Sequence, residues 1–224
     1  MKFTIGIPAY NQADTLPESI ESALAQTTES EVIVVIDGSP DNSEEIARAY
    51  PVKVITQVNK GLASARNTVI MNMTGDYFLP LDSDDILLDN CVEEMIQVIN
   101  LTGADIIAPS LRTFGLSEQD IIVHPSPELK DFQAGNRIPY CSAIKKEALL
   151  ECGGYQPRMA KGFEDLHLWY DLMLRGKKIV GIQEPLVRYR TKKESMWRDA
   201  EKNKKELWEQ IVKDFPIVAS HSKA

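Results

Sequence analysis

The sequence predicts an α/β protein in which a doubly wound, mostly parallel sheet is flanked by helices. Two observations predict this fold. In the first half, short β-branched runs alternate with helical patterns, which is the order of successive strand–helix–strand units with right-handed crossovers. The run EVIVVID at 31–37 is apolar almost throughout, as expected of a strand that helices cover on both faces. In such sheets, ligands bind at the carboxyl ends of the strands.

The elements of the first half follow one another closely. Strands rich in β-branched or aromatic residues are expected at 3–7, 31–37, 52–56 and 77–81. Helices are expected at 14–26, 41–50 and 61–73. In the first helix, Leu16, Ile20 and Leu24 recur at the i, i+4, i+8 spacing of an amphipathic helix. The second helix begins with possible cap residues and with acids in its first turn.

The second half is less regular. Helices are expected at 86–100, at the end of 138–155 and at 163–176, with Gly153 and Gly154 ending the middle one. Short strands are expected at 104–109, 120–124 and 177–182. The charged segment 197–214 is expected to be helical, with little regular apolar face.

Composition narrows the possible functions. The chain has 224 residues, which suits one domain or a large one with an appendage. A net charge of −8 argues against nucleic-acid binding as the main function, although nucleic acid stays open as an acceptor. The three scattered cysteines show no CxxC pair, so neither a disulfide framework nor a zinc site is indicated. The first residues lack the apolar core of a signal peptide, and no apolar run approaches the ~20 residues needed to span a membrane. We therefore expect a cytoplasmic protein. Peripheral membrane contact remains open.

Polar segments follow all four strands of the first half, namely PAYN, DGSPDN, NKG and DSDD. The segment DSDD at 82–85 concentrates three carboxylates, which a divalent cation would neutralise. Magnesium and manganese prefer such oxygen ligands and often share them with substrate phosphates. The alternative is a polar turn in which Asp84 or Asp85 caps the next helix. Because all four segments lie at one edge of the sheet, we favour a single ligand cleft there.

Three further residues have a binding and a structural interpretation. Asp37 could accept hydrogen bonds from a base or ribose, or simply belong to a tight turn. Tyr10 could stack on a nucleobase, or be a half-buried loop tyrosine. Arg66 could hold the nucleotide by a forked contact, or be a surface helix arginine. The sequence has no P-loop, no GxGxxG and no Ser-His-Asp order.

Five segments together carry a family resemblance: IPAYN, VIDGSPDNS, NKGLASARN, GDYFLPLDSDD and FEDLHLWYDLMLRGKKI. Their order and spacing resemble those of family 2 glycosyltransferases with the GT-A fold, from about residue 3 to about residue 190. The resemblance implies a single GT-A domain over 1–195, with a nucleotide-sugar half at about 1–100. An acceptor-side half with a small antiparallel element would follow at about 101–195, and then a charged helical tail at 196–224.

The resemblance also implies site residues. In this family the segment after the first strand binds the nucleobase, which here means Pro8, Ala9, Tyr10 and Asn11. Asp37 would bind the base and Arg66 the nucleotide, with Lys60 and Ser83 also on the donor side. Asp82 would approach the ribose and donor sugar.

Asp84 would ligate the metal that bridges the diphosphate, and Asp165 would be the catalytic base, with Glu164 beside it. The alternative for Asp165 is a helix N-terminal acid stabilised by the macrodipole. Asp85 is expected to contact the backbone of the following helix. The implied activity is inverting transfer of a sugar from a nucleoside-diphosphate sugar, most often a UDP-sugar in this family. The implied cofactor is Mn²⁺ or Mg²⁺, and the acceptor hydroxyl would belong to a glycan, a lipid-linked sugar or another molecule.

One segment departs from the family pattern. After the last strand the family often has an arginine and then a histidine that completes the metal shell. Here Arg190 matches, but Lys192 takes the place of the histidine, and a protonated lysine cannot ligate magnesium. Lys192 could instead contact the diphosphate as a point charge. Arg158 and Lys161 could meet an anionic acceptor, or be solvated charges.

Two other functions are considered. A nucleotidyltransferase shares the architecture but needs a Gly-rich, basic phosphate loop after the first strand, which PAYNQAD lacks. A degenerate domain that binds a sugar nucleotide without turnover is opposed by Asp37, Asp82, Asp84 and Asp165, and is left open by Lys192.

Overall fold

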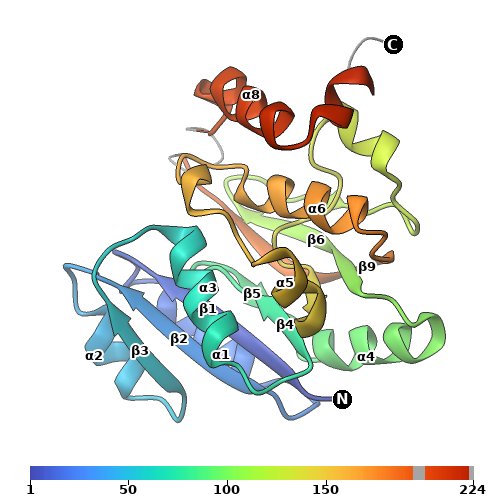
Figure 1. Cartoon of the computed structure of the whole chain (residues 1–224). Coiled ribbons are helices and arrows are strands. Elements are labelled where there is room, and N and C mark those ends of the chain that lie inside the picture. The colour runs from blue at the N-terminus through green and yellow to red at the C-terminus, as the bar shows by residue number, and fades with distance from the viewer. Residues whose placement is uncertain (194–199, 222–224) are drawn as a thin grey trace.

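A computed structural model describes residues 1–193 and 200–221 of the chain. In this described part, one mixed sheet has the strand order β3-β2-β1-β4-β8-β6-β9-β5, and β7 pairs with β6 outside that path. Figure 1 shows helices on both sides of the sheet, with the C-terminal helix α8 lying over α6. No helix in the described ranges combines the length and apolar character needed to cross a membrane.

The first half matches the predicted strand–helix alternation. Its strands are β1 (Phe3–Ala9), β2 (Glu31–Asp37), β3 (Lys53–Gln57) and β4 (Tyr77–Pro80). Its helices are α1 (Leu16–Leu24), α2 (Ser43–Arg48) and α3 (Leu62–Asn72). β1 pairs in parallel with both β2 and β4, and β2 pairs in parallel with β3. The carboxyl ends of these four strands therefore meet at one edge, as the parallel arrangement predicts.

The second half corrects several predicted boundaries. Its elements are β5 (Ile86–Leu87), α4 (Cys91–Thr102), β6 (Ile106–Gly115), β7 (Asp120–Ile121), η1 (Leu129–Ala134), β8 (Ala143–Lys145), α5 (Lys146–Cys152), η2 (Pro157–Met159), α6 (Glu164–Leu174) and β9 (Ile179–Thr191). The helix predicted at 86–100 begins only at Cys91, because Ile86 and Leu87 pair with β9. β6 and β9 are longer than predicted because they pair in parallel with each other, from Ile106 opposite Ile179 to Gly115 opposite Thr191.

The core lies on both faces of the sheet. Alternating side chains of β2 belong to two separate hydrophobic clusters, since Ile33 and Val35 pack in one and Val34 and Ile36 in the other. This division follows from the period of two along a strand. The apolar run of β2 is therefore buried on both faces, as predicted.

The C-terminal segment packs on the core more closely than its composition indicates. α8 (Lys204–Asp214) is followed by η3 (Pro216–His221), and residues 196–199 and 222–224 of the predicted tail lie outside the described part. The prediction of little apolar face is wrong, because Leu207 and Ile211 are buried in the same cluster as α6. These two residues lie one turn apart on one face of α8.

Candidate active site

Two cavities adjoin at the carboxyl edge of the parallel strands. The donor-side cavity has a volume of about 510 Å³ and is lined by Pro8, Ala9, Tyr10, Gln12, Asp37, Asn59, Gly61, Leu62, Ala65, Asp82, Ser83, Asp84, Ala160, Arg190 and Lys192. The acceptor-side cavity has a volume of about 780 Å³ and includes Asn136, Tyr140, Glu164, Asp165 and Trp208 in its lining. Both are lined by Leu62 and Asp82. The strand-end residues that the sequence singles out therefore share one depression, as the fold predicts.

Asp37 organises the floor of the donor-side cavity. Its carboxylate is buried and accepts hydrogen bonds from Gln57 Nε2 at 2.7 Å and from the backbone N–H groups of Lys60 and Gly61 at 2.9 and 2.8 Å. These bonds fix the loop that enters α3. The side chain of Lys60 itself is exposed. Of the first predicted segment, Tyr10 lines the cavity and is 49% exposed. Asn11 is held by its backbone N–H, which donates to Ser39.

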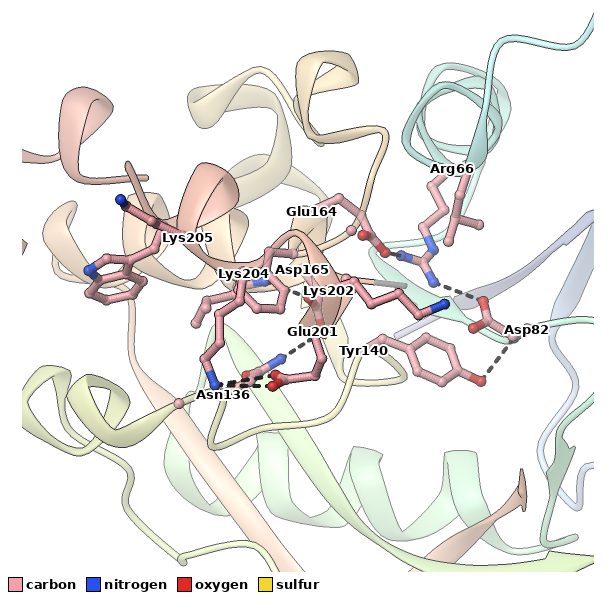
Figure 2. A pocket seen from close by; sticks show the side chains of 17 residues that line it. Arg66, Asp82, Asn136, Tyr140, Glu164, Asp165, Glu201, Lys202, Lys204 and Lys205 are labelled. Atoms are coloured by element: carbon pink, nitrogen blue, oxygen red, sulfur yellow. Dashed lines mark hydrogen bonds and ion pairs between the residues drawn. The ribbon is translucent and has the colours of Figure 1, made fainter. Parts of the chain in front are cut away.

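Arg66 lines the acceptor-side cavity beside Asp82, which both cavities share, and it is fully buried rather than on the surface. Its Nη2 donates to Asp82 at 2.8 Å and its Nη1 to Glu164 at 2.7 Å. Its guanidinium also lies over the rings of Tyr140 and Tyr155. Burial opposes the charge, but Asp82 and Glu164 raise the pKa of Arg66 above its ordinary value. Figure 2 shows Arg66 between these two carboxylates.

The three carboxylates of the DSDD segment have different surroundings. Asp82 pairs with Arg66, and burial raises the pKa of Asp82 to about 6. Asp84 is partly exposed and forms an ion pair of 2.7 Å with Lys192. Asp85 is buried, and burial together with the neighbouring Asp84 and Asp82 raises its pKa.

The expectation for Asp85 is wrong, because no helix follows directly. Its Oδ1 accepts from the backbone N–H of Arg190 at 2.7 Å, and its Oδ2 accepts from the hydroxyl of Tyr140 at 2.6 Å. The same hydroxyl accepts a hydrogen bond from the backbone N–H of Asp82 at 3.0 Å. Asp85 therefore ties the DSDD turn to β9. Ser83 is buried, and its carbonyl accepts from Thr15 at the start of α1.

Asp165 lies on the acceptor side, in the first turn of α6. Its Oδ2 accepts a hydrogen bond from the side-chain amide of Asn136 at 2.7 Å, and its Oδ1 accepts from the N–H of Leu166 at 2.7 Å. Burial, and then the neighbouring Glu164, raise the pKa of Asp165 to about 7. Such a carboxyl group exchanges a proton near neutral pH, as a general base must.

The acceptor-side cavity is closed by the start of the C-terminal segment. Lys202, Lys204, Lys205 and Trp208 line it. Figure 2 shows the three lysines extending in different directions, with Lys202 toward Asp82 and Lys204 beside Glu201. Arg158 and Lys161 are not in its lining. They form ion pairs with Asp214 and Glu206 of α8 instead, at 2.8 and 2.9 Å. These ion pairs join the 155–162 loop to α8, and the proposed contact of the two cations with an acceptor stays a prediction.

Sequence reasoning missed Gln12, Asn136, Tyr140 and Trp208 as site residues. Tyr140 and Asn136 belong to an irregular stretch between β7 and β8, where no periodicity marks them. Trp208 lies on α8, which was expected to be a charged helix with little regular apolar face. For Gln12 the one available signal is its place directly after the predicted PAYN segment.

The end of β9 and the following Lys192 are held by contacts to the DSDD segment and to the start of the chain. The Nε of Arg190 donates to the carbonyl of Asp84 at 2.8 Å, and its guanidinium forms an ion pair with Glu18. Lys192 Nζ lies 2.7 Å from Asp84 Oδ2 and 3.3 Å from Gln12 Oε1. Two oxygens thus converge on one cationic nitrogen. Carboxylate and amide oxygens also suit a hard divalent ion. Across residues 1–193 and 200–221, no three His, Cys, Asp or Glu side chains gather so that they could hold a metal.

Comparison with known proteins decides the family. The family described as "Glycosyl transferase family 2" matches residues 4–160, which is more than half of the chain. The chain belongs to glycosyl transferase family 2. The resemblance of the five segments is thereby confirmed, and a glycosyltransferase domain occupies most of this chain.

Relatives agree with this family 2 assignment. The chain is 32% identical over 221 residues to glycosyltransferase GlyG of Streptococcus pneumoniae, covering 87% of this chain and 72% of GlyG. It is 44% identical over 108 residues to an uncharacterized glycosyltransferase of Rickettsia prowazekii, covering 46% of this chain. That match spans only 34% of the rickettsial protein.

Solved structures of similar fold confirm the GT-A prediction. S. aureus TarS 1–349 in complex with UDP-GlcNAc has a TM-score of 0.79 and 20% identity, covering 95% of this chain and 66% of that one. The mannosyltransferase PcManGT from Pyrobaculum calidifontis, in complex with GDP-Man and Mn²⁺, has a TM-score of 0.72 and 17% identity. It covers 99% of this chain and 69% of that one.

Proposed function

We propose that this family 2 chain moves a sugar from a UDP-sugar to an acceptor hydroxyl and inverts the anomeric configuration. The proposal rests on one observation, which is that two adjoining cavities share Asp82 and Leu62 in their linings. Asp165 lines the cavity opposite the predicted diphosphate site. A base on one side and a leaving group on the other side of the reacting carbon suit an in-line displacement.

The chemistry needs one base and no enzyme nucleophile. The acceptor hydroxyl gives its proton to Asp165 while its oxygen attacks the anomeric carbon. The bond between that carbon and the diphosphate oxygen breaks, and the nucleoside diphosphate leaves with the bonding electrons. A single displacement of this kind inverts the configuration. A pKa of about 7 suits Asp165 to the task at neutral pH.

The donor would lie along the strand ends. Tyr10 presents a partly exposed ring to a nucleobase, and Asp37 fixes the loop that forms the far side of the same cavity. Asp82 would face the ribose and sugar while Arg66 keeps its carboxylate oriented. The UDP-GlcNAc complex of TarS, which has the same fold, supports a UDP-sugar as donor.

A divalent cation would be held by Asp84, with Gln12 as a second oxygen donor on the same side. When bound, the ion would stabilise the negative charge of the departing diphosphate. The Mn²⁺ complex of PcManGT supports this cofactor. On the acceptor side, Phe163 and Trp208 line the cavity and offer ring faces to a carbohydrate. A glycan or a lipid-linked sugar is therefore the acceptor class that we propose.

The test is release of nucleoside diphosphate from a panel of UDP-GlcNAc, UDP-glucose, UDP-galactose and GDP-mannose, with Mn²⁺ present. Hydrolysis of the donor needs no acceptor, so the assay works before the acceptor is known. We expect release from at least one UDP-sugar and its loss in Asp82→Ala. Tight UDP binding without any release would instead indicate the degenerate domain, and would overturn the proposal.

A further inference from the structure

The side chain of Lys192 occupies the position at which the donor site needs positive charge. Its Nζ bridges Asp84 Oδ2 and Gln12 Oε1 at 2.7 and 3.3 Å. All three residues line the donor-side cavity. The pair is only partly screened by water, because 32% of the Lys192 side chain and 23% of the Asp84 side chain are exposed.

The backbone before Lys192 is fixed from several sides. Arg190 donates its backbone N–H to Asp85 and its Nε to the carbonyl of Asp84. Thr191 pairs with Gly115 at the end of the β6–β9 ladder, and its hydroxyl donates to Phe114 at 2.8 Å. The backbone therefore reaches Lys192 from an anchored strand, and its Nζ meets Asp84 of the DSDD segment. A strand so anchored places the ammonium reproducibly.

Two arginines near this cavity are already engaged in ion pairs. Arg66 is shared between Asp82 and Glu164, and Arg190 is paired with Glu18. Among the described residues, Lys192 forms an ion pair with Asp84, which is the predicted metal ligand. A diphosphate that enters the cavity would thus meet Lys192 and Asp84 together. An ammonium there adds a charge-assisted hydrogen bond to a phosphate oxygen and offsets the repulsion from Asp84.

We propose that Lys192 is a built-in cation of the donor site, which binds the diphosphate of the nucleotide and competes with a divalent ion for Asp84. The inference rests on the proposed function, because it assumes that a nucleoside diphosphate binds in this cavity. It gives two consequences. Nucleotide binding persists without metal, and the affinity of the protein for metal alone is lowered by the adjacent ammonium.

The test measures UDP binding by calorimetry in EDTA, and binding of Mn²⁺ alone by the electron paramagnetic resonance of free Mn²⁺. In EDTA, Lys192→Met should weaken UDP binding by about tenfold or more, the loss expected of one charge-assisted hydrogen bond. Lys192→Arg should stay within about threefold of wild type because it keeps the charge. With Mn²⁺ alone, Lys192→Met should bind about fivefold more tightly, since the repelling charge is gone.

Lys193→Met is the matched control, because Lys193 is the next residue and is exposed. It should change neither measurement. Equal UDP binding by wild type and Lys192→Met in EDTA would overturn the inference, as would wild-type binding that appears only with Mn²⁺ or an equal loss in Lys192→Arg. If wild type bound UDP under no condition, the proposed function would fail and the inference with it. Thermal melting of each variant checks that the fold is retained.

Discussion

The guanidinium of Arg66 donates a 2.7 Å hydrogen bond to the carboxylate of Glu164, which lies 98 positions later in the chain. This contact joins helix α3 of the parallel half to helix α6 of the second half. Because Glu164 precedes Asp165, it also fixes the start of the helix that carries the proposed base. The two cavities that we propose for donor and acceptor are thus linked through one buried arginine.

Replacing Arg66 should therefore destabilise the protein as well as inactivate it. Arg66→Met leaves Asp82 and Glu164 without their cation, and breaking a buried ion pair in this way costs about 3–5 kcal/mol. Urea denaturation measures the free energy of unfolding. Arg48→Met is the control, because Arg48 pairs with Glu44 on the surface. Such exposed i, i+4 pairs contribute little to stability. Equal losses in the two variants would contradict the central place given to Arg66.

The rate of sugar transfer should depend on pH through Asp165. Since only the carboxylate accepts a proton and its pKa is raised to about 7, activity should rise as the pH increases through about 7. Asn136→Ala removes a hydrogen bond that lowers this pKa, so the acid limb of the pH profile should move to higher pH. The measurement is the pH profile of transfer for both proteins. A variant with a lower rate but an unmoved profile would show that Asn136 does not act on the base.

Gly38 allows the loop after β2 to pass closely beside the donor-side cavity. Its φ is +65°, and an added Cβ would lie 2.6 Å from the backbone nitrogen of Asn59, a cavity-lining residue. Gly38→Ala should thus lower stability and weaken UDP binding. Gly103→Ala is the control, because Gly103 has a φ of +64° and open space at the Cβ position.

The left-handed backbone costs each alanine about 1–2 kcal/mol, and overpacking should add about 1–3 kcal/mol in Gly38→Ala alone. Calorimetric melting and UDP titration of both variants measure the two effects. If Gly38→Ala were no less stable than Gly103→Ala, the close approach to Asn59 would be irrelevant.

The parallel half could be predicted from sequence because its information is local. Each strand is a short apolar run, each helix has its own periodicity, and the sheet topology brings the strand ends together. Asp37, Asp82 and Asp84 could be singled out for that reason. The structure shows the contacts that these three carboxylates make, whereas their individual roles in the site remain predictions.

The second half depends on pairing between distant residues, which local patterns do not reveal. β5 is two residues long and exists because β9 pairs with it. Asp85 was expected to cap a helix, yet it accepts from Arg190, 105 positions away. Arg158 and Lys161 were candidate acceptor contacts, but α8 supplies carboxylates that neutralise them. The burial of Leu207 and Ile211 is likewise decided by the partner surface of α6.

The most direct measurement compares sugar transfer and UDP binding in wild type and Asp165→Asn. Asparagine keeps the size of the side chain but cannot take the proton, and Asp165 lies outside the donor-side cavity lining. We expect transfer to an acceptor to fall by about 10²-fold or more, the usual contribution of a general base. UDP binding should stay within about threefold of wild type, because no donor contact is lost. Undiminished transfer by Asp165→Asn would contradict the proposed mechanism.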